Sequence, residues 1–127
     1  MIEIMKKAVA MFPLQVPAEW NEHVVLQVDG MFITVSFRNG KVFFDKGKAF
    51  DPTSVVQLSC QRICNIIDGS IDYMTVWREL AEPSPTDRTY ILQGNGAKLF
   101  VVLDGITKCY SSNGEFKKIL DSYKMSL

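Results

Sequence analysis

The chain has 127 residues, and its 14 basic and 14 acidic side chains leave no net charge at neutral pH. Nucleic-acid-binding domains usually carry a basic excess, so this balance argues against a nucleic-acid partner, and no run of lysine or arginine offers an anchor for an anionic membrane surface. No apolar stretch reaches the roughly 18 residues that a bilayer-spanning helix needs, and three cysteines are an odd number for a disulfide framework. We therefore expect one cytoplasmic domain over residues 1–127, with residues 1–20 as an N-terminal segment and no stable membrane insertion.

The first half of the chain is predicted to be a short helix followed by strands. Apolar residues at near-helical spacing in the first dozen positions predict the helix, which ends at Pro13. From residue 23 apolar and polar residues alternate, as in strands with one buried face. Asn39-Gly40 favours a type I′ hairpin turn, because both residues tolerate a positive φ. We expect an antiparallel meander with strands over 23–28, 31–38, 41–46 and 53–58.

Two amphipathic helices are predicted after these strands. Ser59 can cap the first, over 59–68, whose apolar residues share one face. Asp72 can cap the second, over 72–80, before two prolines end it. Both helices need an apolar surface to cover, and one face of the sheet supplies it.

The last part of the chain adds a strand and a helix. A strand is predicted over 87–93, and Ser112 with Glu115 has the spacing of a capping box at the start of a C-terminal helix. The predicted fold class is therefore α+β: a mainly antiparallel sheet of about five strands with helices covering one face.

Three sequence blocks occur in a distinctive order. They are ITVSFRNGKV at 33–42 followed by Gly47, PTSVVQLS at 52–59 leading to Ile63 and Ile67-Asp68-Gly69, and YILQG at 90–94. Together they resemble the sterol carrier protein 2-like domains. The resemblance implies an apolar tunnel between sheet and helices that holds sterols, fatty acids or acyl chains, in proteins that are mostly carriers and not enzymes.

The segment 99–103, LFVVL, leaves two structures open. The resemblance implies a helix there. Its β-branched valines and the following Asp104-Gly105 favour a hairpin instead.

The loop Gly94-Asn95-Gly96, followed by Lys98, has some features of a phosphate-binding loop. A dinucleotide fingerprint needs a third glycine three positions later, where this chain has Leu99, and the P-loop signature is absent. We therefore predict a turn at the end of a strand and no nucleotide cofactor.

Neither the cysteines nor the histidine predict a metal or catalytic site. Cys60 and Cys64 lie one helical turn apart in an apolar stripe, and zinc would need two further ligands, for which His23 and Cys109 have no ligand spacing. A lone histidine without a nucleophile motif gives no catalytic set. We predict core cysteines, a surface histidine, no cofactor and no enzyme activity.

The apolar residues leave two functions open. Two consecutive amphipathic helices carry more apolar surface than one sheet face needs, which favours a non-catalytic carrier of an apolar or acyl-chain lipid in a hydrophobic cavity. The alternative is an interaction or assembly module, for example a homodimer, in which the same residues fill the core. The residues predicted to line the cavity are Phe32, Phe44, Ile63, Ile67, Tyr73, Met74, Trp77, Leu99 and Phe100.

Overall fold

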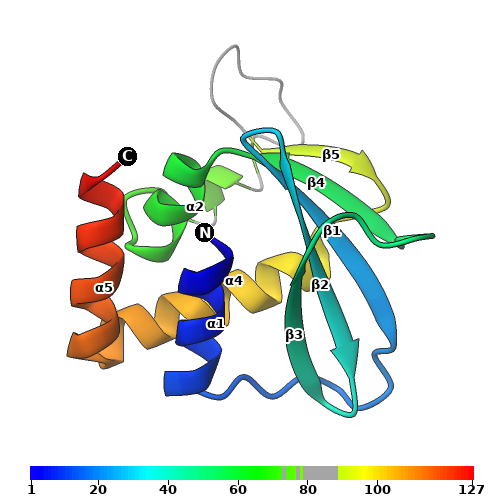
Figure 1. The fold of residues 1–127 in the computed structure, drawn as a ribbon, viewed down its shortest axis with the longest axis horizontal. Helices are drawn as coiled ribbons and strands as arrows, with labels where there is room; N and C mark the ends of the chain where they lie inside the picture. The colour runs from blue at the N-terminus through cyan, green and yellow to red at the C-terminus, as the bar shows by residue number, and fades with distance from the viewer. Residues whose placement is uncertain (73, 77, 79–88) are drawn as a thin grey trace.

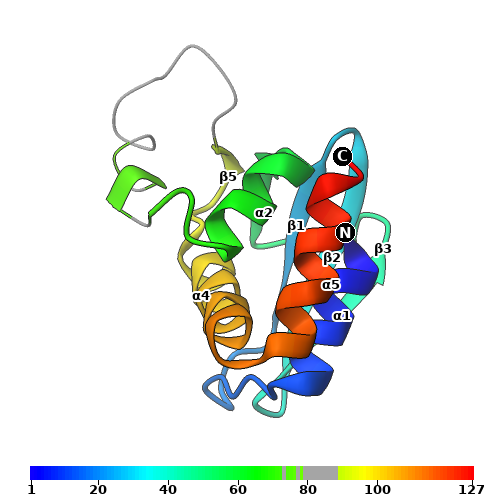
Figure 2. The same ribbon diagram turned by 90° about the vertical axis from the view of Figure 1, so that its left-hand side faces the viewer.

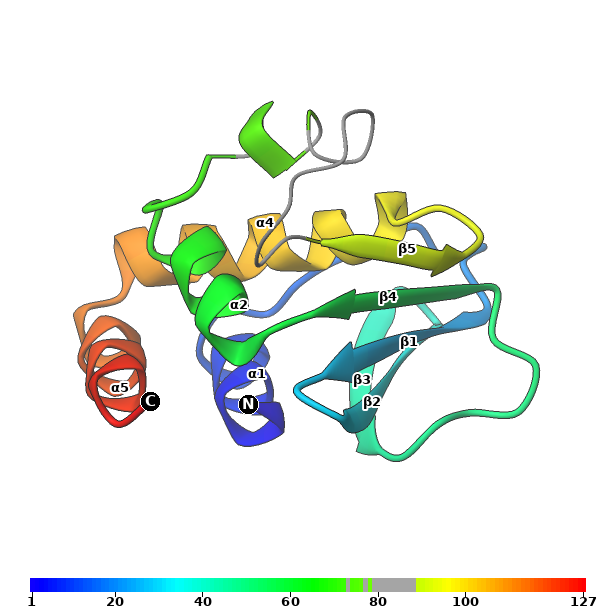
Figure 3. The ribbon, with the colours of Figure 1, turned by 90° about the horizontal axis from the view of Figure 1, so that it is seen from above.

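The computed structural model describes residues 1–72, 74–76, 78 and 89–127, which form a sheet with helices packed against one face (Figure 1). The strands are β1 (Glu22–Val28), β2 (Met31–Arg38), β3 (Lys41–Lys46), β4 (Ser54–Leu58) and β5 (Tyr90–Gln93). The helices with described bounds are α1 (Ile2–Met11), α2 (Cys60–Ile67), α4 (Ala97–Ser112) and α5 (Gly114–Met125). The predicted α+β class is confirmed, with helices on one side of a mainly antiparallel sheet (Figure 3).

The strand order is β3-β2-β1-β4-β5, which corrects one part of the predicted meander. β4 does not continue beyond β3 but lies parallel to β1, on the edge of β1 away from β2. In this position Val56 of β4 pairs with Leu26 of β1 and is fully buried. A position outside β3 would leave the apolar strand β4 at a sheet edge. Burial of its apolar side chains therefore explains why β4 pairs with β1.

The two hairpin turns have the geometry that their sequences predict. Asp29 and Gly30 have φ of 49° and 83°, and Asn39 and Gly40 have φ of 53° and 75°. Positive φ at both central residues is the requirement of a type I′ turn, whose twist matches the flanking strands.

Helix caps agree with the sequence at α2 but not at α5. The Ser59 hydroxyl accepts a hydrogen bond from Arg62 N (3.0 Å), as predicted. The predicted capping box at Ser112 is wrong, because α4 continues through Ser112, whose hydroxyl donates to Lys108 O within that helix (2.7 Å). Asn113 is the first residue to leave helical geometry, and its side chain accepts from Glu115 N and Phe116 N (both 3.1 Å).

The segment 99–103 is helical, as the resemblance implied, and belongs to α4 (Figure 2). Burial outweighs the weak helix propensity of its valines, since Val102 is fully buried against the core. Gly105 lies within the helix and is no turn residue. A Cβ there would come within 2.5 Å of Leu14 Cδ1, so glycine lets α4 approach the segment after α1.

The second predicted helix, over 72–80, falls partly outside the described residues. Residues 74–76 and 78 are helical. The Asp72 carboxylate accepts from Thr75 N (2.7 Å), which confirms its capping role. Tyr73, Trp77 and the rest of that range lie outside the described residues, as do the first two residues of the predicted strand 87–93.

The core fills the space between the two layers. The sheet contributes alternate residues of each strand, and the helices contribute their apolar faces. The largest fully buried side chains include Met5, Leu26, Phe37, Ile63, Leu99, Leu103 and Phe116.

Candidate ligand-binding cleft

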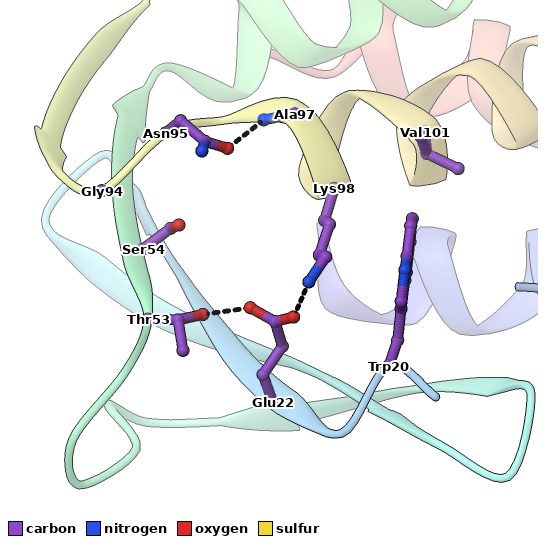
Figure 4. A pocket seen from close by; sticks show the side chains of 9 residues that line it. All are labelled: Trp20, Glu22, Thr53, Ser54, Gly94, Asn95, Ala97, Lys98 and Val101. Atoms are coloured by element: carbon purple, nitrogen blue, oxygen red, sulfur yellow. Dashed lines mark hydrogen bonds and ion pairs between the residues drawn. The ribbon is translucent and has the colours of Figure 1, made fainter. Parts of the chain in front are cut away.

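A cleft of about 360 Å³ lies at one end of the sheet, where β1 and β4 begin, β5 ends and α4 begins (Figure 4). This volume is within the range of small-molecule sites, roughly 300–1,000 Å³. Its lining residues are Trp20, Glu22, Thr53, Ser54, Gly94, Asn95, Ala97, Lys98 and Val101.

The sheet and α4 bring the two charged residues of the cleft together. Glu22 is the first residue of β1 and shares its strand face with Val24 and Leu26, which point towards the helices. Lys98 is the second residue of α4. The parallel pairing of β1 with β4 places Thr53 beside the start of β1, where its N–H donates to His23 O (3.0 Å).

Glu22 and Lys98 form an ion pair inside the cleft. The Glu22 carboxylate accepts from the Lys98 ammonium on one oxygen and from the Thr53 hydroxyl on the other (2.5 Å). The two side chains are 15% and 33% exposed, so both are partly withdrawn from water. Such a pair is less screened than one on the open surface.

Trp20 forms an apolar wall beside the pair (Figure 4). Its ring stands edge-on to the buried ring of Phe37, with centroids 5.3 Å apart and an interplanar angle of 84°. The Lys98 ammonium lies 5.0 Å from the centroid of the Trp20 ring, within cation–π distance. Contacts with the Phe37 ring and with the Lys98 ammonium hold the indole in place, and Val101 adds exposed apolar surface at the rim.

Gly94 lines the cleft and Gly96 lies just behind it, and both glycines are closely packed. Gly94 has φ of +66°, and a Cβ there would lie 2.3 Å from Thr53 O. A Cβ on Gly96 would lie 2.7 Å from the Phe100 ring and 2.9 Å from Ile91. The predicted turn at the end of the strand is confirmed. Glycine is needed at both positions because a side chain at either one would collide with its neighbours.

The residues predicted to line a cavity fall into four groups. Five of them lie together in the core between sheet and helices and are buried: Phe44, Ile63, Ile67, Leu99 and Phe100. Phe32 lies on the other face of the sheet, where it pairs with Gln27 and has the Lys48 ammonium 5.7 Å from its ring centroid. Met74 is 70% exposed. Tyr73 and Trp77 lie outside the described residues, and the role of all nine in ligand binding stays a prediction.

The cleft adjoins the buried group through α4. Leu99 and Phe100 directly follow Lys98, so one side of the first turn faces the cleft and the other faces the core. Sequence reasoning missed Trp20, Glu22 and Thr53 altogether. It noted Lys98 only as part of the glycine loop, and no spacing in the sequence connects residue 98 with residue 22.

Burial accounts for the properties of the cysteines. Burial raises the pKa of the Cys64 thiol to about 11, and it raises the pKa of Cys60 and Cys109 as well. Cys64 and Cys109 are buried in the core, and the partly exposed Cys60 packs against it, which confirms the core prediction.

His23 is exposed, with Nδ1 2.8 Å from the Ser36 hydroxyl. Within the described ranges, no three or more histidine, cysteine, aspartate or glutamate side chains lie close enough to hold a metal ion.

Two solved structures align with most of this chain. A crystal structure of sterol carrier protein 2 aligns with 87% of this chain and 84% of its own at a TM-score of 0.47 and 13% identity. A solution structure of a conserved hypothetical protein from Thermus thermophilus, a candidate sterol carrier protein, aligns with 84% of this chain and 74% of its own at 0.46 and 13% identity.

No protein-family model matches the chain, and no curated protein matches it. Among the described helices, none is long and apolar enough to cross a membrane. The function therefore has to be inferred from the cleft and its surroundings.

Proposed function

We propose that this protein is a non-catalytic carrier that binds an apolar or acyl-chain ligand, with the cleft as the entrance and as the seat of the ligand's polar end. The observation that carries this proposal is the composition of the cleft. A concave space of about 360 Å³ combines an aromatic wall, Trp20, with one charged pair, Glu22 and Lys98. Ligand sites are commonly built in this way, with apolar walls that provide affinity and a few polar groups that orient the ligand.

The hydrocarbon part of the ligand would extend from the cleft towards the core at the first turn of α4. Ile91 and Phe100 flank Gly96 there, and Leu99 lies behind them. Each buried methylene contributes about 0.8 kcal/mol, so eight methylenes supply about 6 kcal/mol before the costs of ordering the ligand. The proposal requires side chains at this end of the core to move aside when the tail enters.

A carrier needs no catalytic group, and the three thiols have the properties of unreactive core residues. Burial raises the pKa of each cysteine, which keeps the thiols protonated and weakly nucleophilic at neutral pH. All three cysteines are free, which is consistent with a reducing compartment such as the cytoplasm.

Two measurements on the purified protein test the proposal. Mass spectrometry of the denatured protein should detect a co-purified lipid. Titration with the uncharged apolar dye N-phenyl-1-naphthylamine should show saturable binding near one dye per chain. We expect Ala97→Trp to abolish dye binding, because the added indole fills the cleft from an exposed position on α4.

Lys108→Trp is the matched control. It adds the same indole to the same helix, at a side chain that is 68% exposed and outside the cleft. Dye binding by this variant should equal that of the wild type. If the wild type binds neither lipid nor dye and forms a concentration-dependent dimer, the carrier proposal is wrong and the protein is an assembly module.

A further inference from the structure

The charges in the cleft cancel each other. Glu22 and Lys98 are in direct contact, and the other seven lining residues carry no formal charge. The side chains that line the cleft therefore carry no net charge. Among these side chains, a ligand that brings a charge of either sign finds no uncompensated counter-charge.

The ion pair still has hydrogen-bonding capacity for a ligand. An ammonium group has three donors, and a carboxylate has about four acceptor sites. In the described structure Lys98 donates to Glu22, and Glu22 accepts from Lys98 and from Thr53. Figure 4 shows the carboxylate and the ammonium group side by side, with Thr53 on one side and Trp20 on the other. A group that both donates and accepts can therefore contact the carboxylate and the ammonium at the same time.

A carboxylate ligand would meet repulsion at the same place. To reach the Lys98 ammonium it would have to approach the Glu22 carboxylate, because these two groups touch. Like charges in a partly buried site repel more strongly than on the open surface, since solvent screens them less. An alkylammonium ligand would meet the corresponding repulsion from Lys98.

We infer that the polar end of the ligand is uncharged and both donates and accepts hydrogen bonds, as a hydroxyl group does. The hydroxyl donates to the Glu22 carboxylate and accepts from the Lys98 ammonium, while the chain beyond it lies against Trp20. This inference rests on the proposed function and adds to it a selection against fatty acids and alkylamines.

Isothermal titration calorimetry at pH 8 with 1-decanol, decanoate and decylammonium tests the inference. Because an alcohol is more apolar than either ion, it can bind the wild type more tightly for that reason alone. The test is therefore the change in each Kd that a substitution causes, and not the ratio of the wild-type Kd values. Glu22→Gln removes the repulsion and leaves Lys98 as a free counter-charge. We expect its Kd for decanoate to fall at least tenfold, while its Kd for 1-decanol changes less than threefold.

Two further variants keep the test decisive. Lys98→Gln should lower the Kd for decylammonium at least tenfold, and it gives the answer if Glu22→Gln fails to fold. Asp104→Asn removes a negative charge from an exposed pair with Lys108 on the same helix as Lys98, outside the cleft, and should change none of the three Kd values more than twofold.

The outcomes separate this inference from the proposed function. Equal shifts in decanoate affinity for Glu22→Gln and Asp104→Asn would overturn the selection for an uncharged end, even if 1-decanol binds tightly and the carrier proposal stands. If neither the dye nor any of the three chains binds to the wild type, the proposed function fails, and this inference fails with it.

Discussion

The two ends of helix α4 differ in the residues that surround them. At its first turn Lys98 and Val101 border an open cleft, and Val101 is 43% exposed. Towards its other end Ile106 and Cys109 are buried in the same core cluster as Phe116 of α5. One helix thus serves two purposes: its later turns hold the helical layer together, while its start leaves space beside the sheet.

This difference shows why the number of apolar residues does not reveal a binding site. Leu99 and Phe100 are as well buried as side chains of the packed end, yet they lie directly behind the cleft. What distinguishes the open end is an unusual neighbourhood of polar and small residues, with an ion pair and two glycines at the edge of the core. Substitutions at the packed end should therefore reduce stability, and substitutions at the open end should change ligand binding.

The largest effect is expected at the packed end. Phe116 is fully buried, so Phe116→Ala removes most of a ring and leaves a cavity. We expect the free energy of unfolding to fall by about 4 kcal/mol, measured by urea denaturation. Dye affinity of the folded variant should change less than threefold, because Phe116 does not line the cleft.

Met125 provides the control for this change on the same helix. It is 89% exposed, so Met125→Ala should alter stability by less than about 0.5 kcal/mol. A loss below about 1 kcal/mol for Phe116→Ala would contradict the comparison, since it would mean that the far end of the layer is loosely packed as well.

The next largest effect is expected at Gly94, which lines the cleft. Gly94→Ala places a methyl group at positive φ and against Thr53 O, so we expect a loss of about 3 kcal/mol. Gly30→Ala also has a positive φ, of +83°, but meets no atom within 4 Å, and it should cost about 1 kcal/mol. Thermal unfolding of the two variants measures the difference.

Ligand titration makes the same pair of variants informative about the cleft. Because the methyl group of Gly94→Ala pushes against the Thr53 backbone, dye affinity should fall in that variant and not in Gly30→Ala. Equal stability losses for the two variants would show that close packing at Gly94 is unimportant.

Local sequence signals predicted the elements well and their arrangement less well. The Asn39-Gly40 turn joins two strands across two residues, so its chemistry alone determines the hairpin. The position of β4 depends on which strand edge buries Val56, and nothing within residues 53–58 specifies the edge of β1. Local propensity was misleading over 99–103 for the same reason, because burial of Val102 between the layers favours the helix.

The cleft could not be predicted from sequence because its parts come from distant segments. Glu22 and Lys98 are 76 positions apart, and Thr53 lies between them in the chain. Each residue is ordinary in its own context: a polar residue at the start of a strand, a lysine in the first turn of a helix, a threonine in a loop. The parallel pairing of β1 with β4, which sequence reasoning missed, brings Thr53 beside Glu22, and the start of α4 brings Lys98 to the same carboxylate.

The smallest effect is expected for an ion pair in the helical layer, which we compare with the ion pair of the cleft. Asp68, which ends α2, accepts a hydrogen bond from the ammonium of Lys124 on α5 (2.5 Å). Burial alone would raise the pKa of Asp68, but hydrogen bonds from Lys124 and Ser70 outweigh it and hold the pKa below its ordinary value. The folded state therefore favours the charged carboxylate, and this stabilisation is present at neutral pH and lost as the pH falls through the lowered pKa.

We expect Asp68→Asn to reduce the free energy of unfolding by about 1 kcal/mol at pH 7, and the difference from the wild type should shrink as the pH falls below about 4. Urea denaturation at pH 7, 5 and 3 measures it, and Asp104→Asn, in an exposed pair, should cost less than about 0.5 kcal/mol throughout. The affinities for decanoate and decylammonium should stay unchanged in Asp68→Asn, whereas Glu22→Gln changes the first of them. If Asp68→Asn altered ligand selectivity as much as Glu22→Gln, the two pairs would have the same role, and the distinction between a packed end and a binding end of α4 would not hold.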